Sequence, residues 1–129
     1  MPAVTGTPLD HERYISLETF KKDGTGVKTP VWAAPLDGRL VIVTNGTSYK
    51  VKRLRNDPTC KVAPCDVRGN VQGSWYEGTG RVLEDPGEKA RALAALQQKY
   101  GWQIRVLDFF SRLGRRMGRR AFLELSLDE

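Results

Sequence analysis

The chemistry with the clearest basis in the sequence is anion binding by the segment Asn45–Pro58, which reads NGTSYKVKRLRNDP. The orphan N–H groups of a helix N-terminus, with lysines one to three positions inside the helix, form a site suited to phosphate. A solvated basic helix at the surface is the alternative interpretation. Four of the six residues from position 50 to 55 are cationic: Lys50, Lys52, Arg53 and Arg55.

The same segment contains the signals of a short helix. Val51 and Leu54 are spaced i and i+3, which gives a narrow apolar stripe that can dock on a core. Thr47 or Ser48 can cap the N-terminus, and Asp57-Pro58 forces the chain out of helical geometry. The sequence therefore predicts a short helix with its cations near the first turn.

Side chains that could perform catalysis by themselves are scarce. The single histidine, His11, lies in a loose N-terminal lead-in, and no serine lies in a nucleophile elbow. Cys60 and Cys65 have no histidines near them, so we expect buried free thiols rather than a zinc site. We predict no catalytic side chain and no metal ligand, so the chain either binds a ligand or uses a cofactor to carry the reaction.

The residues Thr29-Pro30-Val31-Trp32 favour the cofactor interpretation. Pro30 cannot donate a ladder hydrogen bond, so this strand lies at an edge, at a bulge, or beside a bound group. An aromatic cofactor could lie against the freed backbone, and Trp32 could pack near it. In the alternative interpretation, Trp32 belongs to the core and Pro30 marks an edge strand.

Length and charge limit the class of protein. The chain has 129 residues and a formal net charge of +6, which fits one domain, residues 1–129, with an anionic partner. A second basic cluster covers residues 112–120, but the aromatic-basic interleaving of common RNA modules is missing, so we expect no nucleic acid partner. Weak contact with a membrane surface remains open. Without a signal peptide or a run long enough to cross a bilayer, we expect a cytoplasmic protein.

The remaining elements must position these residues. Alternating apolar residues and Asp-Gly turns predict six strands in an antiparallel barrel with a few helices packed outside it, a mainly β (α+β) fold. The strands are expected over residues 14–20, 27–36, 39–44, 59–65, 74–83 and 121–127. After Asp85-Pro86 we expect a helix with an apolar face made by Ala90, Leu93, Ala94 and Leu96, and a further helix over 104–113.

The order of motifs resembles a known family. The strand DG-x-x-x-x-TPVW, followed by T-x-x-K-x-K-R-L-R-x-DP and GSWYEGTGRVLED, is similar to the pyridoxamine 5'-phosphate-oxidase-like split β-barrel superfamily. Within that superfamily it most resembles the actinobacterial group of coenzyme F420-dependent oxidoreductases, whose fold is like that of FMN-binding proteins. The resemblance covers about residues 12–126. It implies a homodimer with cofactor sites at the subunit interface and hydride transfer to an unsaturated small-molecule acceptor.

The resemblance also implies roles for particular residues. It places Lys50 at the phosphate, with Lys52 and Arg55 at the phosphate or an anionic tail, and it departs from some relatives that have an arginine where Ser48 stands. FMN is the alternative cofactor, and a non-enzymatic module that binds a cofactor or nucleic acid is the alternative function. The ring would lie against Thr29, Pro30, Val31 and Trp32, and the ribityl chain beside Thr44, Thr47 and Ser48.

Overall fold

The computed structural model describes residues 7–45, 49–101 and 120–128. The helix expected over 104–113 and most of the second basic cluster lie outside this part of the chain. Within it, no helix has both the length and the apolar composition needed to cross a lipid bilayer.

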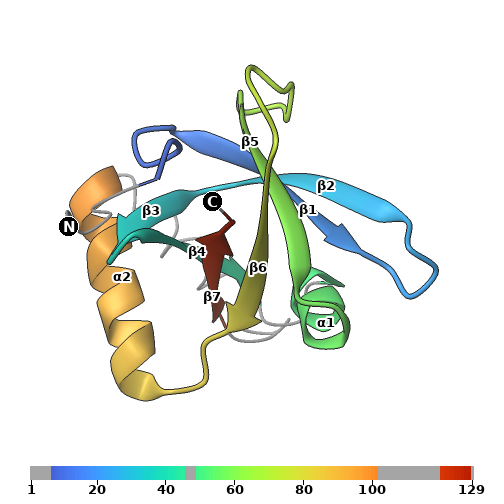
Figure 1. Ribbon diagram of the computed structural model, residues 1–129. Helices are drawn as coiled ribbons and strands as arrows, with labels where there is room; N and C mark the ends of the chain where they lie inside the picture. The colour runs from blue at the N-terminus through green and yellow to red at the C-terminus, as the bar shows by residue number, and fades with distance from the viewer. Residues whose placement is uncertain (1–6, 46–48, 102–119, 129) are drawn as a thin grey trace.

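The described residues form one antiparallel sheet of seven strands, in the order β2-β1-β5-β6-β7-β4-β3. Figure 1 shows the sheet strongly curved, with the β5–β6 connection projecting beyond it. This architecture confirms the mainly β split-barrel prediction. The strands are β1 (Tyr14–Phe20), β2 (Gly26–Val31), β3 (Ala33–Leu36), β4 (Arg39–Asn45), β5 (Thr59–Cys65), β6 (Tyr76–Val82) and β7 (Arg120–Leu127).

The seventh strand arises because the single strand expected over 27–36 divides at Trp32. Val31 pairs with Ile15 of β1, whereas Ala33 pairs with Ile42 of β4, so the chain leaves one edge of the sheet and enters the other. The predicted count of six strands was therefore one too low. Proline lacks the N–H that a central strand would need, and β2 and β3 each contain one proline in an edge strand.

The strand β4 divides the apolar interior into two cores. Leu40 and Ile42 face the barrel interior, whereas Val41 and Val43 face a second cluster beneath the helix α2 (Pro86–Tyr100). Because successive strand residues point to opposite faces, a strand buried on both faces reads as a continuous apolar run. The uninterrupted apolar run Leu40–Val43 in β4 follows from this burial on both faces.

The helix α2 begins and ends where the sequence predicted. The Asp85 side chain caps it by accepting from the Glu88 N–H at 3.0 Å, and Gly101 ends it with φ of 55°. The predicted apolar face was wrong in part, because Ala90 and Ala94 are exposed. The helix instead buries every fourth residue against the second core: Ala92, Leu96 and Tyr100.

Gly78 and Gly80 mark places where the backbone or a side chain of β7 approaches β6 closely. A Cβ added at Gly78 would lie 2.5 Å from the carbonyl oxygen of Ser126 in the neighbouring strand β7. At Gly80 an added Cβ would lie 2.8 Å from a methyl carbon of Leu125. The pairing of β6 with β7, which keeps the barrel closed on that side, therefore depends on both glycines.

We predict that Gly78→Ala lowers the free energy of unfolding by about 1–3 kcal/mol, because the added methyl must push β7 away. Urea denaturation of the variant and the wild type measures this difference. Thr79→Val is the control, since Thr79 is exposed on the same strand and should change stability by less than about 0.5 kcal/mol. Equal stability of the Gly78 variant and the wild type would show that the approach of β7 is not constrained.

Candidate functional site

The basic segment forms the helix α1 (Tyr49–Asn56), which is anchored by its apolar stripe. Val51 and Leu54 are buried in the barrel core, as predicted, and the helix packs against β1 and β6. In Figure 1, α1 and α2 lie on different sides of the curved sheet. Burial of this stripe sets the rotation of α1 about its axis. The rotation in turn determines where each cation of the helix lies.

Lys50 is the cation of α1 in the least favourable environment. It is half-buried, and burial lowers the pKa of its ammonium, with a smaller contribution from Arg53. No carboxylate lies within 4.0 Å of it among residues 7–45, 49–101 and 120–128. The first turn of α1 also has no acidic residue, so the positive end of the helix dipole adds to this cost. A bound anion would stabilise both the ammonium and the helix terminus.

Tyr49 lies beside this lysine and gathers two further cations. Its ring is 68% exposed, with Lys52 Nζ 5.4 Å and Arg53 Cζ 5.6 Å from its centroid. Arg53 also donates to Thr19 Oγ1 of β1 at 3.4 Å. Tyr49 was not among the residues predicted to bind the ligand, although the spacing Tyr49-x-x-x-Arg53, one helical turn, indicates a contact between the two side chains.

Arg55 already has a partner at the far end of α1. Its guanidinium lies 2.9 Å from Glu84 Oε1, and both side chains are exposed. Exposed ion pairs contribute about 0–1 kcal/mol, so an incoming anion can compete with Glu84. Arg55 would therefore have to leave Glu84 in order to bind a ligand anion.

Thr29, Pro30 and Val31 are the last three residues of the edge strand β2, and Trp32 follows them. Pro30 is exposed on this edge, and Val31 is buried. The hydroxyl oxygen of half-buried Thr29 is shielded from water, yet it has no hydrogen-bond partner within the described part of the chain. Such a group costs about 1–3 kcal/mol, which a small side-chain rotation toward a polar ligand would recover.

Trp32 stacks on Tyr100 of α2, with ring centroids 4.7 Å apart and planes 12° from parallel. It is only half-buried, so one part of the indole contributes to packing while the rest remains accessible. These features are those of the alternative interpretation, since Trp32 packs against the second core and Pro30 lies in an edge strand. The ring supports the crossing between β2 and β3, and its contact with a cofactor stays a prediction.

The β1–β2 hairpin relates Arg53 of α1 to the TPVW segment. Arg53 of α1 touches Thr19, which pairs with Val27, and Thr29 to Val31 lie two to four residues further along β2. At about 3.3 Å per residue, this is a separation of roughly 7–13 Å. The strand β4, which carries half-buried Thr44 and leads into α1, approaches β2. Thr47 and Ser48 lie outside the described residues.

This arrangement suits a ligand with a ring at one end and a phosphate at the other. The edge of β2 offers an apolar surface and an unpaired hydroxyl, and α1 offers a half-buried cation that lacks a counter-charge. The residues present therefore fit a flavin-type phosphate cofactor. Among the described residues there is no group of three or more His, Cys, Asp or Glu side chains that could hold a metal ion.

Solved structures share this fold at low sequence identity. A conserved hypothetical protein from Mycobacterium tuberculosis matches with a TM-score of 0.69 and 21% identity, over 94% of this chain and 76% of its own. HutZ, the heme storage protein from Vibrio cholerae, matches with a TM-score of 0.69 and 10% identity, over 92% and 83%. An F420 reductase matches with a TM-score of 0.58 and 16% identity, over 94% and 90%. At these identities the likeness establishes the fold alone.

No curated protein matches the chain. The sequence model of pyridoxamine 5'-phosphate oxidase, by contrast, matches residues 6–129. That family includes oxidoreductases and binds flavin-type or related cofactors. The resemblance inferred from the TPVW strand and the basic segment is thereby confirmed, and the chain belongs to the pyridoxamine 5'-phosphate oxidase family.

Proposed function

We propose that this protein is a coenzyme F420-dependent oxidoreductase that reduces an unsaturated organic acceptor in the cytoplasm. The observation that carries the proposal is Lys50, a half-buried cation in the first turn of α1 that has no carboxylate within 4.0 Å in the described residues. When bound, the reduced deazaflavin supplies the hydride. The protein itself binds and orients the reactants and excludes water.

Each binding residue has a distinct task in this proposal. Lys50 neutralises the cofactor phosphate, and the exposed Lys52 attracts the additional anionic groups of the F420 tail. Arg55 can join it by exchanging Glu84 for the ligand. The ring lies along the edge of β2 formed by Thr29, Pro30, Val31 and Trp32, and the polyol chain lies near Thr44, Thr47 and Ser48.

Protonation of the reduced acceptor needs a proton donor, and none of the proposed cofactor-binding residues provides one. Tyr49 lies at the start of α1 and is 68% exposed, and Tyr76 lies half-buried at the start of β6. Either phenol, or solvent, can deliver the proton. Neither phenol lies in the edge strand β2, where the ring of the cofactor is proposed to bind. Which of them donates the proton therefore depends on where the acceptor binds.

FMN is the second candidate cofactor, because it has the same ribityl phosphate that Lys50 would recognise. F420 is favoured because α1 carries further cations besides Lys50. The anionic tail of F420 can bind these cations, whereas FMN has no additional anionic groups. A non-enzymatic binding module is the third candidate. Gel-shift assays with DNA and RNA address it, since salt-sensitive binding retained after Lys50→Ala and Lys52→Ala would favour the module.

Titration of the purified protein with F420 and with FMN separates the two cofactors. Fluorescence or calorimetry gives each Kd under the same salt conditions. The proposal expects tighter binding of F420, and an affinity that falls as ionic strength rises because the tail contacts are exposed. Tight FMN binding with no F420 binding would overturn the choice of cofactor.

We predict that Lys50→Ala weakens F420 binding by roughly 10- to 100-fold. A hydrogen bond to a charged group contributes about 1.5–3 kcal/mol, and each 1.4 kcal/mol corresponds to a factor of about ten in Kd. Calorimetric titration measures the change, with Lys61→Met on β5 as the control for loss of one positive charge. Unchanged binding together with a loss of folding stability would mean that Lys50 serves only the fold.

We predict that Thr29→Val raises the free energy of unfolding of the ligand-free protein by about 1 kcal/mol, because the substitution removes an unpaired buried hydroxyl. Urea denaturation measures it. The matched control is Thr19→Val, which should lower stability because the fully buried Thr19 accepts from Arg53. If both valine variants lose stability equally, Thr29 is not unpaired and its assignment to the ligand is contradicted.

We propose a homodimer with a cofactor site at the subunit interface, and we predict that sedimentation equilibrium finds twice the chain mass of 14.5 kDa. Support from this structure comes from the β5–β6 connection that projects from the sheet (Figure 1), where Val67 and Val71 are 62% and 42% exposed. Val67→Asp should weaken the dimer if this connection is part of the interface. A monomer at all concentrations would exclude the interface site.

A further inference from the structure

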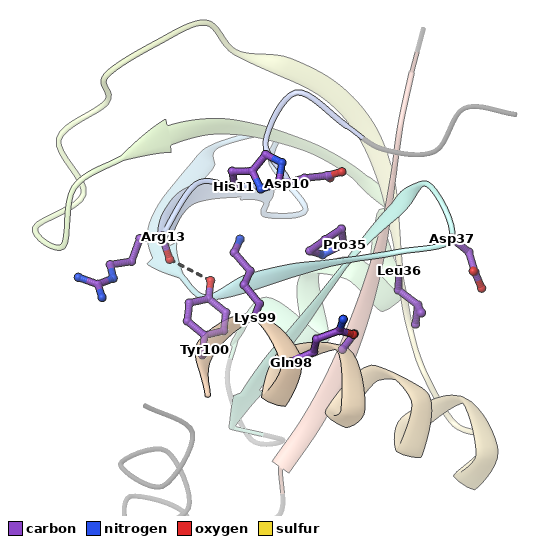
Figure 2. Close-up of a pocket in the computed structure, with 10 residues that line it drawn as sticks. Asp10, His11, Arg13, Pro35, Leu36, Asp37, Gln98, Lys99 and Tyr100 are labelled. Carbon is purple, nitrogen blue, oxygen red and sulfur yellow. Dashed lines mark hydrogen bonds between the residues drawn. The ribbon is translucent and has the colours of Figure 1, made fainter. Parts of the chain in front are cut away.

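A pocket of about 630 Å³ lies between the N-terminal segment, the free edge of β3 and the last turns of α2. This volume is within the range of pockets that hold small organic ligands. It shares no residue with the cofactor site proposed above. Figure 2 shows its lining, which comes from Asp10, His11, Arg13, Pro35, Leu36, Asp37, Ala95, Gln98, Lys99 and Tyr100.

Lys99 is the charged group that enters this pocket. Figure 2 shows its side chain extending from α2 toward the segment that carries Asp10 and His11, whereas the side chains of Arg13 and Asp37 point away. Its ammonium donates to two backbone carbonyls, those of Glu12 at 2.6 Å and Ala33 at 2.5 Å. An ammonium has three N–H groups, so one donor of Lys99 remains for a ligand.

Two of the carboxylates near the pocket have other partners. Asp10 accepts a hydrogen bond from Thr7 at 2.6 Å, and Asp37 is paired with Arg91. No carboxylate comes within 4.0 Å of Lys99 in the part of the chain that the structure describes. Burial lowers the pKa of Lys99 to about 8, with Asp10 and Glu12 acting in the opposite direction. The ammonium is therefore a partly desolvated cation that a ligand anion would stabilise.

The Tyr100 hydroxyl offers little to such a ligand. It accepts from the Ala33 N–H at 3.0 Å and lies 2.9 Å from the carbonyl oxygens of Arg13 and Ala33. Because the hydroxyl is already used by the backbone, the tyrosine contributes its ring to the wall. The apolar part of the lining consists of this ring with Pro35, Leu36 and Ala95.

We propose that this pocket is a second binding site, which takes a small organic carboxylate with an apolar body. The carboxylate accepts a hydrogen bond from Lys99, and the body packs against Pro35, Leu36 and Tyr100. Carboxylate is favoured over a neutral carbonyl because a charge-assisted hydrogen bond is about twice as strong as a neutral one. The preference thus follows from the burial of the Lys99 ammonium and from the absence of a carboxylate within 4.0 Å of it in the described residues.

Nitrogen–proton correlation NMR of the full-length protein tests the proposal with two probes of similar shape, phenylacetate and phenylacetamide. Phenylacetate should produce saturable shifts in the amides of Asp10–Arg13, Leu36–Asp37 and Gln98–Tyr100. Phenylacetamide should bind at least ten-fold more weakly, because it lacks the charge. Equal affinities, no saturable shifts, or shifts centred on α1 would each overturn the assignment.

Two variants separate binding from folding. Lys99→Met should weaken phenylacetate binding at least ten-fold, whereas Lys89→Met on the same helix should leave it unchanged. Ala95→Leu fills part of the pocket and retains Lys99, so it should also weaken binding at least ten-fold, and it decides the question if Lys99→Met fails to fold. Unchanged binding in the folded variants would contradict the proposal. Lys50→Ala should leave phenylacetate binding intact, which separates this site from the cofactor site.

Discussion

One residue, Trp32, carries the chain from one edge of the sheet to the other, and the positions of both sites depend on this crossing. Val31 before it pairs with β1, and Ala33 after it pairs with β4. The stack of Trp32 on Tyr100, at 4.7 Å, ties the crossing to the end of α2. Offset aromatic contacts of this kind contribute about 0.5–1.5 kcal/mol beyond their buried area. The crossing therefore holds β2, with the proposed cofactor residues, and β3, with the second pocket, in a fixed relation.

The crossing also protects the free edge of β3. An exposed edge invites pairing with other chains, but the N–H and carbonyl groups of Ala33 are used by Tyr100 and Lys99. Pro35 has no N–H to offer. The cofactor side differs, since the edge of β2 keeps exposed Pro30 and the unpaired hydroxyl of Thr29. Strand pairing is thus blocked at Ala33, whereas in our proposal the edge of β2 takes the cofactor.

Two half-buried lysines, Lys50 and Lys99, have lowered pKa values because both are partly removed from water. Their surroundings explain why they have different ligands in our account. Lys50 lies in the first turn of a helix, where backbone N–H groups add positive potential suited to phosphate. Lys99 lies in the last turn of α2, and two of its N–H groups already contact backbone carbonyls, so it has one donor for a smaller anion.

Local patterns in the sequence were sufficient for most elements. The apolar run in RLVIVT and the Asp85-Pro86 start of α2 are local features of the sequence, and the structure has a strand and a helix start at these places. The burial of Val51 and Leu54 in α1 was predicted from their i, i+3 spacing in the same way.

The errors came from contacts between residues far apart in the chain. The strand expected over 27–36 divided because its halves pair with β1 and β4, and this choice of partners leaves no local signal. The apolar face of α2 was misplaced because Tyr100 is held by Trp32 and the backbone of Ala33 and Arg13, which rotates the helix toward Ala92 and Leu96. Lys99 and its pocket were missed for the same reason, since Glu12 and Ala33 lie far from it in sequence.

In our proposal the Lys50 ammonium binds the phosphate of the cofactor, and the titration of this ammonium tests the assignment most directly. Lysine-selective NMR labelling gives the pKa of Lys50 with and without F420. Burial holds this pKa below 10.5 in the free protein, and an adjacent phosphate should raise it because an opposite charge favours the ammonium. A pKa of Lys50 that stays the same when F420 is bound would contradict the account.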